Sequence, residues 1–449
     1  MPADKFQRIL FECTQIYESR GTSGIPRVVR NLAASGIVAA QEQGVELVPV
    51  VFRGSRMYPV RLRPPSLDNR PTTIVCMQRR LEQWLGPRVG GKLARIIQRV
   101  NRRLEKTLYP RSIVRAADGL RRRCLVPELH ATPQDLIVLG GSAWTRAART
   151  GVELAKQRGM PLGVIVYDLI PIDHPEFFSR RAAAVFRDWI DRTMGAVDFS
   201  LSISRTTRER LWNYAVQGHP HRRWDPAQFA SFALGTEIDT QAVDGRFRHD
   251  LAQAFHGGSG APAYLTVSTI EPRKNHAFLI DAFERLWAAG LDGRLCIVGR
   301  VGWLCEDLLR RIRSHPRYGQ SLFMFNDLSD AELDYCYRHA KAFLFPSKDE
   351  GFGLPIVESL SYGLPVLVSD IPIHREVGGP FCAYFDLSDP GTLARQIEDF
   401  ERSGALPGVA PAKGFRPVNW DDSARDFVRQ ILTTVANLKD GGALRRTAA

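Results

Sequence analysis

Residues 345–358 read Phe-Pro-Ser-Lys-Asp-Glu-Gly-Phe-Gly-Leu-Pro-Ile-Val-Glu, a stretch typical of a buried strand, a glycine-bearing loop and a helix start. The apolar run ending at Phe345 predicts the strand, and Pro355 suits the first turn of a helix. Such a loop presents free backbone N–H groups at a helix N-terminus, which can hold an anion. Glu350 in the loop and Glu358 in the helix can therefore face one ligand, although a capping arrangement with a solvated glutamate is the alternative.

A second stretch, residues 266–276, reads Thr-Val-Ser-Thr-Ile-Glu-Pro-Arg-Lys-Asn-His. Its pattern predicts a strand ending near Ser268 and a helix starting near Asn275, with Arg273 and Lys274 on the connection. Two cations near a helix N-terminus oppose the helix dipole unless an anion lies there. We therefore expect Arg273 and Lys274 to meet the anion of the glycine loop, where they would stabilise a leaving diphosphate.

Strand and helix patterns alternate along the chain, which predicts an α/β protein with parallel sheets covered by helices. The glycine-rich segment 256–262 is typical of a linker between two such units. We predict domains 1–240 and 241–418, a terminal helix with tail at 419–449, and a cleft where ligands bind at the carboxyl ends of the strands. In the second domain the expected strands are 263–268, 294–298, 322–325, 342–345, 365–368 and 383–385, and the expected helices 275–288, 303–314 and 331–340.

The composition is that of a globular protein of two domains. The chain has 449 residues, of which 44% are hydrophobic and 24% are charged. Its seven cysteines are scattered, without metal-ligand spacing, which favours reduced thiols. Neither a signal-peptide pattern nor a membrane-spanning apolar run is found in the sequence. These features predict a cytoplasmic protein.

The net charge of +13 is concentrated in one segment. Residues 79–123 hold 14 basic and 3 acidic residues, a net charge of +11. Within an insert at about 78–124, apolar residues recur at helical spacing beside a basic stripe, which favours a helix lying on an anionic membrane surface. The alternatives are a packed surface helix with solvated charges, or a nucleic-acid-binding protein. Because no nucleic-acid module is recognisable, we expect no nucleic-acid partner.

Taken together, these stretches resemble the retaining glycosyltransferases of family 4, which have the GT-B fold of two facing Rossmann-like domains. The resemblance covers the second domain, through the runs at 271–276, 297–299, 345–358 and 363–370, and the Trp-Asp-Asp-Ser-Ala run at 420–424. It implies that Arg273 and Lys274 bind the donor diphosphate and that Glu358 binds the ribose. It further implies that Glu350, Gly351, Phe352, Gly353 and Leu354 hold the donor sugar, and that Asn326 and Leu328 lie by the base.

In the first domain the resemblance is confined to two motifs. The loop at 21–24 and the following helix start are similar to the glycine loop that approaches the donor phosphates, and Gly24 is the residue implied. Val166-Tyr167-Asp168 resembles a strand-end motif that normally reads His-Asp, so Tyr167 stands in place of the histidine. Asp168 is a candidate for orienting the sugar or acceptor, or alternatively a cap for the next turn.

The resemblance implies transfer of a hexose from a nucleotide-diphosphate sugar to a glycan or lipid-linked saccharide in bacterial surface polysaccharide synthesis. We expect GDP-mannose or a related donor, retention at the anomeric carbon, and no metal or other cofactor, since Arg273 and Lys274 can replace a divalent ion. The expected location is the cytoplasm, peripheral at the inner face of the cell membrane. The alternative within the fold is a nucleotide-sugar epimerase or a phosphorylase.

Overall fold

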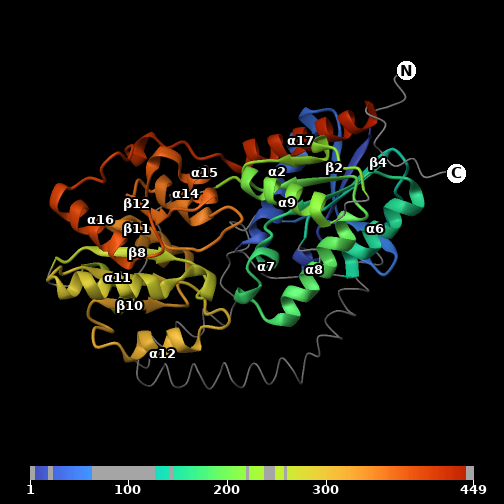
Figure 1. The fold of residues 1–449 in the computed structure, drawn as a ribbon. Helices are drawn as coiled ribbons and strands as arrows, with labels where there is room; N and C mark the ends of the chain where they lie inside the picture. Colours follow the sequence, from blue (N-terminus) through green and yellow to red (C-terminus); the bar gives the residue numbers. More distant parts are fainter. Residues whose placement is uncertain are drawn as a thin grey trace, which may run out of the picture. The chain divides into compact units, whose positions relative to one another are not determined.

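The computed structural model describes residues 6–18, 24–62, 127–141, 146–218, 222–236, 248–256 and 260–440 (Figure 1). By packing, the chain divides into two compact units. The first unit comprises Met1–Gln41 with Val45–Met160, and the second comprises Glu42–Gly44 with Pro161–Ala449. The described strands form one sheet of seven strands and one of six.

The first unit contains strands in the spatial order β3-β2-β1-β4. Strand β1 pairs in parallel with β2 and β4, while β3 is antiparallel to β2. Its strands are β1 (Arg8–Glu12), β2 (Glu46–Arg53), β3 (Arg56–Pro59) and β4 (Asp135–Leu139), and its helices are α1 (Thr14–Glu18), α2 (Ile25–Glu42) and α6 (Arg146–Arg158). The strands β1 and β4 are almost wholly buried, as expected for parallel strands covered by helices.

The second unit holds the other three strands of that sheet, in the order β5-β6-β7, with parallel pairing of β5 with β6 and of β6 with β7. The elements here are β5 (Leu162–Val166), α7 (Ile170–Asp173), η1 (Pro175–Phe177), α8 (Arg180–Met194), β6 (Phe199–Ser202), α9 (Arg205–Gly218), η2 (Pro226–Gln228) and β7 (Phe229–Ser231). Helix α17 (Trp420–Asp440) packs beside β7. Its Phe427 ring lies 5.1 Å from that of Phe232, and Ser423 Oγ donates to Ala233 O at 2.7 Å.

The six-stranded sheet lies wholly in the second unit and is parallel throughout, in the order β10-β9-β8-β11-β12-β13. Its strands are β8 (Ala263–Val267), β9 (Arg294–Val298), β10 (Leu322–Phe325), β11 (Ala342–Phe345), β12 (Val366–Ser369) and β13 (Cys382–Phe385). Its helices are α10 (His249–His256), η3 (Pro272–Lys274), α11 (His276–Ala288), α12 (Glu306–Ser314), α13 (Asp330–His339), α14 (Leu354–Ser361), α15 (Pro372–Gly378), η4 (Gly379–Phe381), α16 (Pro390–Ser403) and η5 (Ala412–Gly414). The strand order reverses between β8 and β11, and such a switch point is where doubly wound sheets bind ligands.

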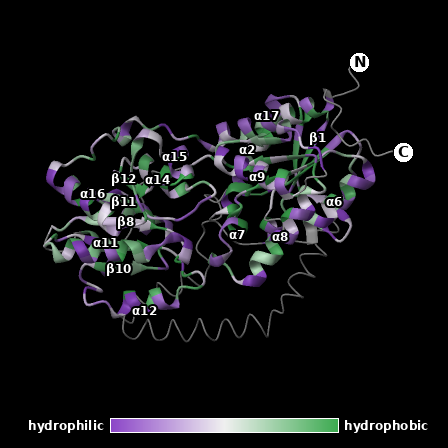
Figure 2. Cartoon of the chain, viewed as in Figure 1, coloured by the Kyte–Doolittle hydropathy of each residue, from purple (hydrophilic) through white to green (hydrophobic). Residues whose placement is uncertain are grey.

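Helices cover both faces of this sheet because successive strand residues point to opposite sides. On β11, Ala342 and Leu344 belong to the core shared with α11 and α16, whereas Phe343 and Phe345 belong to the core shared with α10, α13 and α14. Figure 2 shows the same division, with hydrophobic strands inside and hydrophilic outer helix faces. The buried strands fix where the connecting loops start, and thereby place the site.

The predicted α/β class with two parallel-sheet Rossmann-like domains is confirmed. The predicted domain limits and the cleft stay predictions. The basic insert at 78–124, with the membrane contact expected for 79–123, lies outside the described residues. Within the part of the chain that the structure describes, no helix is long and apolar enough to cross a membrane.

Candidate active site

Two loops leave the sheet at the switch point between β8 and β11. The first runs from Ser268 through the short helix η3 to Asn275, whose left-handed backbone (φ 55°) ends that turn before α11 begins. The second runs from β11 to α14 and carries Glu350. Since β8 and β11 are adjacent parallel strands, both loops start from the same edge of the sheet. The sequence-predicted cations and carboxylate therefore meet.

Glu350 pairs with both cations. Its Oε2 lies 2.6 Å from Arg273 Nη1, and its Oε1 accepts from Lys274 Nζ. Arg273 also donates to the backbone oxygen of Asp349 at 2.7 Å and lies 2.8 Å from Glu271. We call Glu271, Arg273, Lys274, Asp349 and Glu350 the charged cluster. Four of its members are less than 9% exposed, and only Arg273 is somewhat more accessible.

Pairing controls the ionisation of this cluster. Burial alone raises the pKa of Glu350, but Arg273 and Lys274 outweigh it and bring the pKa to about 2. Burial and the neighbouring Arg273 lower the pKa of Lys274, while Glu350 opposes that change. Burial likewise lowers the pKa of Arg273, but Glu350 and Glu271 more than compensate and raise it. Glu350 is thus an anion, and it neutralises part of a site built from two cations.

The glycine loop packs tightly against the segment after β5. A Cβ at Gly351 would lie 2.2 Å from the backbone oxygen of Tyr167 and 3.2 Å from Asp168 Cβ, so only glycine fits. This contact brings the predicted Asp168 beside Gly351. Asp168 Oδ1 accepts from Ile170 N at 3.1 Å, and burial raises the Asp168 pKa while Arg273 opposes that rise. Asp168 thus caps the next turn and also adjoins the charged cluster, so the two roles are compatible.

Helix α14 begins without a side-chain cap. Its N-cap is Gly353, which has a left-handed backbone (φ 98°) and no side chain to accept from the first turn. Phe352 and Leu354 are half-buried on either side. Pro355 has no N–H, and Ile356 N donates to Gly353 O at 2.9 Å. The positive end of the helix dipole suits an anion or a sugar hydroxyl.

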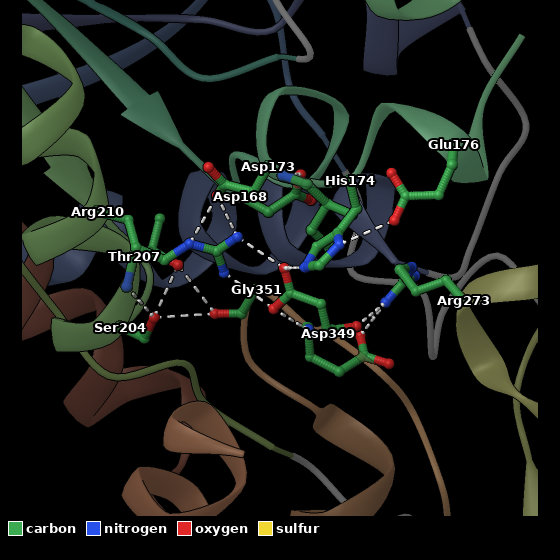
Figure 3. A network of polar contacts seen from close by, with 12 residues as sticks. Asp168, Asp173, His174, Glu176, Ser204, Thr207, Arg210, Arg273, Asp349 and Gly351 are labelled. Atoms are coloured by element: carbon green, nitrogen blue, oxygen red, sulfur yellow. Dashed lines mark hydrogen bonds and ion pairs between the residues drawn. The ribbon is translucent and has the colours of Figure 1, made fainter. Parts of the chain in front are cut away.

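Arg210, which the sequence interpretation missed, anchors the loop from helix α9 (Figure 3). Its guanidinium donates to both carboxylate oxygens of Asp349, at 2.9 Å and 2.6 Å, and its Nε donates to Asp173 at 2.8 Å. Asp349 also accepts from Glu350 N at 2.8 Å, so Arg210 acts on Glu350 through its neighbour. Arg210 lies 139 residues before Asp349, and no local pattern indicates such a pair.

Hydroxyl groups of the same region hold the glycine loop on its other side. Ser204 Oγ and Thr207 Oγ1 donate to Gly351 O at 2.9 Å and 3.3 Å (Figure 3). Close by, the backbone N–H groups of Arg205 and Thr206 donate to the Glu376 carboxylate at 2.7 Å and 2.8 Å, which caps α9. The glycine loop is therefore held at the Asp349 side chain by Arg210 and at the Gly351 carbonyl group by the two hydroxyls.

A buried histidine lies near the glycine loop. His374 Nδ1 lies 3.0 Å from Ser369 O, and the Ser369 hydroxyl donates to Ser347 O at 2.5 Å. Because the carbonyl oxygen of Ser369 can only accept, Nδ1 carries the histidine proton. Nε2 is left as an acceptor with no partner among the described residues. Burial lowers the His374 pKa to about 4, so the ring is neutral. The sequence interpretation missed this residue as well.

The remaining predicted residues are not members of the charged cluster. Glu358, on α14, accepts from the Tyr337 hydroxyl at 3.1 Å. Asn326 and Leu328 follow β10, two strands away from β8; Asn326 is exposed, and Leu328 packs against the core. Gly24 lies in the first unit at the start of α2, with φ 63°. Their parts in donor binding stay predictions.

Comparison with known proteins identifies the class. Residues 253–408, which include the whole charged cluster, match the model of the family described as Glycosyl transferases group 1. The predicted resemblance is confirmed at the level of the group 1 glycosyltransferases, whose model residues 253–408 match.

Two curated relatives come from Escherichia coli. The serotype-specific mannosyltransferase WbdA is 31% identical over 284 residues, which cover 63% of this chain and 35% of WbdA. The O-antigen chain mannosyltransferase B is 30% identical over 162 residues, covering 35% of this chain and 42% of the relative. The chain thus spans 35% to 42% of the length of these relatives.

The solved structure of Anabaena Alr3699/HepE, in complex with UDP and glucose, has a similar fold. Its TM-score is 0.53 at 13% sequence identity, covering 97% of this chain and 99% of HepE. At this identity the likeness concerns the fold alone.

Proposed function

We propose that this chain is a hexosyltransferase that moves mannose or a related sugar from a nucleotide-diphosphate sugar to a hydroxyl of a glycan or lipid-linked saccharide. The carrying observation is the charged cluster, in which Arg273 and Lys274 converge with Glu350 at the switch point of a parallel sheet. Mannosyl transfer in bacterial surface polysaccharide synthesis is supported by the names of the two relatives. Membership of family 4 and a GDP-mannose donor belong to the same proposal.

In the proposed reaction the donor diphosphate contacts Arg273 and Lys274, the two cations that pair with Glu350. Arg273 and Lys274 stabilise the charge that grows on the diphosphate as its bond to the anomeric carbon breaks. The acceptor oxygen bonds to that carbon on the same face, and its proton passes to the leaving phosphate. The bonding pair leaves with the diphosphate, and because the acceptor attacks from the face that the diphosphate leaves, the configuration is retained.

Two further features complete the proposed donor site. The α14 N-terminus and Glu350 hold the sugar near its anomeric carbon, while Glu358 accepts from the ribose hydroxyls. The two cations take the place of a divalent metal ion on the leaving group.

We also place the protein in the cytoplasm, peripheral at the inner face of the membrane through residues 79–123.

Incubation of the protein with a panel of nucleotide sugars and a soluble mannoside tests this proposal. We expect release of nucleoside diphosphate with one donor, undiminished by a chelator, and a product whose anomeric configuration matches that of the donor. Inversion would refute the retaining mechanism, and loss of activity with chelator would refute metal independence. Absence of turnover with every donor, or conversion of the donor without transfer, would refute the proposed glycosyltransferase activity.

A further inference from the structure

Exposed apolar side chains gather on the loop after β9. Val301, Trp303 and Leu304 are 40%, 44% and 54% exposed, and all three rank among the large exposed hydrophobic residues. We call these three residues with the half-buried Phe178 the Trp303 patch. Contiguous exposed apolar side chains commonly mark a binding surface.

The indole ring in this patch is held in place although it is exposed. Trp303 Nε1 donates to Phe177 O at 2.8 Å, and the ring centroid lies 5.9 Å from that of Phe178. The hydrogen bond satisfies the polar atom and restricts rotation of the ring. A fixed aromatic surface that faces solvent is ready to stack on a ligand without losing much conformational freedom.

The backbone next to the ring is strained. Leu304 has φ 51°, in the left-handed region that residues with a Cβ rarely adopt. The Leu304 side chain is exposed to solvent, so its burial does not offset the cost of the strained backbone. Strained residues persist where the surrounding structure enforces them, and they cluster at binding sites.

The Trp303 patch is continuous with the charged cluster. Gly302 N donates to Ile270 O at 2.9 Å, and a Cβ at Gly302 would lie 3.4 Å from Glu271 Cβ. On the other side, the Phe177 ring stacks on His174 at 5.2 Å, and His174 Nε2 lies 3.8 Å from the Asp349 carboxylate. Two short chains of contacts therefore connect Trp303 to Glu350.

Polar groups flank the aromatic ones. The side chains of His174 and Glu176 are 37% and 61% exposed and lie 3.1 Å apart (Figure 3). A pyranose has an apolar C–H face and a belt of hydroxyls, which suits an aromatic ring beside a carboxylate and an imidazole.

We propose that the Trp303 patch binds the acceptor saccharide, with its C–H face on the indole and its hydroxyls toward His174 and Glu176. The inference rests on the proposed function and names a surface for its acceptor. A lipid surface would also accept exposed tryptophan and leucine. Continuity with the charged cluster and the fixed indole N–H favour a saccharide.

Saturation-transfer NMR on the full chain tests the proposal, with methyl α-mannopyranoside and methyl α-glucopyranoside as probes. We expect Trp303→Ala to weaken saccharide binding about tenfold or more, and Trp303→Phe to keep most of it because the stacking face remains. Binding of nucleotide sugar, followed in the same samples, should stay unchanged in both variants. Tyr318→Ala is the matched control, because Tyr318 is 40% exposed and precedes β10, at the amino ends of the strands.

Three results would overturn the inference: no saturation of either glycoside by the wild type, equal binding by Trp303→Ala, or an equal loss in Tyr318→Ala. Flotation with anionic phosphatidylglycerol vesicles tests whether the Trp303 patch binds a lipid surface. Vesicle binding that depends on Trp303, without saccharide binding, assigns the patch to a membrane instead. Failure of the proposed function is distinguishable, because it appears as a wild type that binds no nucleotide sugar, whatever the glycosides do.

Discussion

The charged cluster and the Trp303 patch lie side by side, yet they are built in opposite ways. In the charged cluster Glu271 and Glu350 are paired with Arg273, and Glu350 also contacts Lys274. In the Trp303 patch the side chains other than the half-buried Phe178 are exposed, and the indole N–H donates to Phe177 O. The cluster offers fixed charges to a charged group, whereas the patch offers a surface to a partly apolar one. Chemistry on a diphosphate needs the first arrangement, and recognition of a saccharide needs only the second.

The largest effect should come from removing a cation from the cluster. We expect Lys274→Ala to reduce turnover by about 10³-fold or more, because donor binding and leaving-group stabilisation both depend on that charge. Release of nucleoside diphosphate and circular dichroism measure activity and folding. Lys341→Ala, which removes an exposed lysine of the same domain, should leave turnover intact. Full activity of Lys274→Ala would refute the site assignment.

A substitution in the glycine loop should act next. We expect Gly351→Ala to lower kcat/KM about 100-fold, because its Cβ would meet Tyr167 O at 2.2 Å and the loop would have to shift. Overpacking of this kind also costs about 1–3 kcal/mol of stability, visible as a lower Tm. Gly218→Ala is the control, because a Cβ there meets nothing within 4 Å. Equal behaviour of both variants would contradict the close packing.

Substitution of Arg210 tests whether this residue positions Glu350 for catalysis or only stabilises the fold through its ion pairs. Arg210→Met should lower kcat about tenfold with a smaller change in donor KM, since Glu350 loses its support through Asp349. Arg311 is the matched control, because it also bridges two carboxylates, at 2.6 Å and 2.9 Å, and is 34% exposed against 25% for Arg210. We expect both variants to lose about 1 kcal/mol in thermal melts, and only Arg210→Met to lose kcat. A kcat for Arg210→Met equal to that of Arg311→Met would eliminate the positioning role.

The smallest effect concerns pH. Burial and Arg273 lower the pKa of Lys274 from 10.5, so as pH rises the ammonium is lost earlier than in an ordinary lysine. Activity should therefore begin to fall below pH 10.5, with about half lost at the Lys274 pKa. Lys274→Arg keeps its charge at these pH values, so its relative profile should stay flat. Glu350, whose pKa is about 2, should contribute nothing to the acid side. Identical basic sides for the two proteins would assign that ionisation elsewhere.

The sequence predicted the six-stranded sheet closely. Strands 294–298, 322–325 and 342–345 were placed at the residues where β9, β10 and β11 lie. Such short apolar runs are buried on both faces, so local composition alone marks them. Of the helix predicted at 303–314, the end at Ser314 is confirmed but the start is wrong, because α12 starts at Glu306 and Leu304 has a left-handed backbone. Helical periodicity extended across residues that form an exposed loop.

The candidate site also has a part that local sequence predicts and a part that it does not. Local sequence patterns indicate which residues leave the switch strands, since Arg273, Lys274, Glu350 and the glycines are contiguous with strong strand and helix signals. The contacts of those residues come from the folded chain: Glu350 neutralises both cations, Arg210 fixes Asp349, and Trp303 is exposed beside Phe177. Strand and helix signals arise from neighbours along the chain, whereas these contacts join segments 76 to 139 residues apart. Packing of the whole sheet brings such segments together, and no local pattern records it.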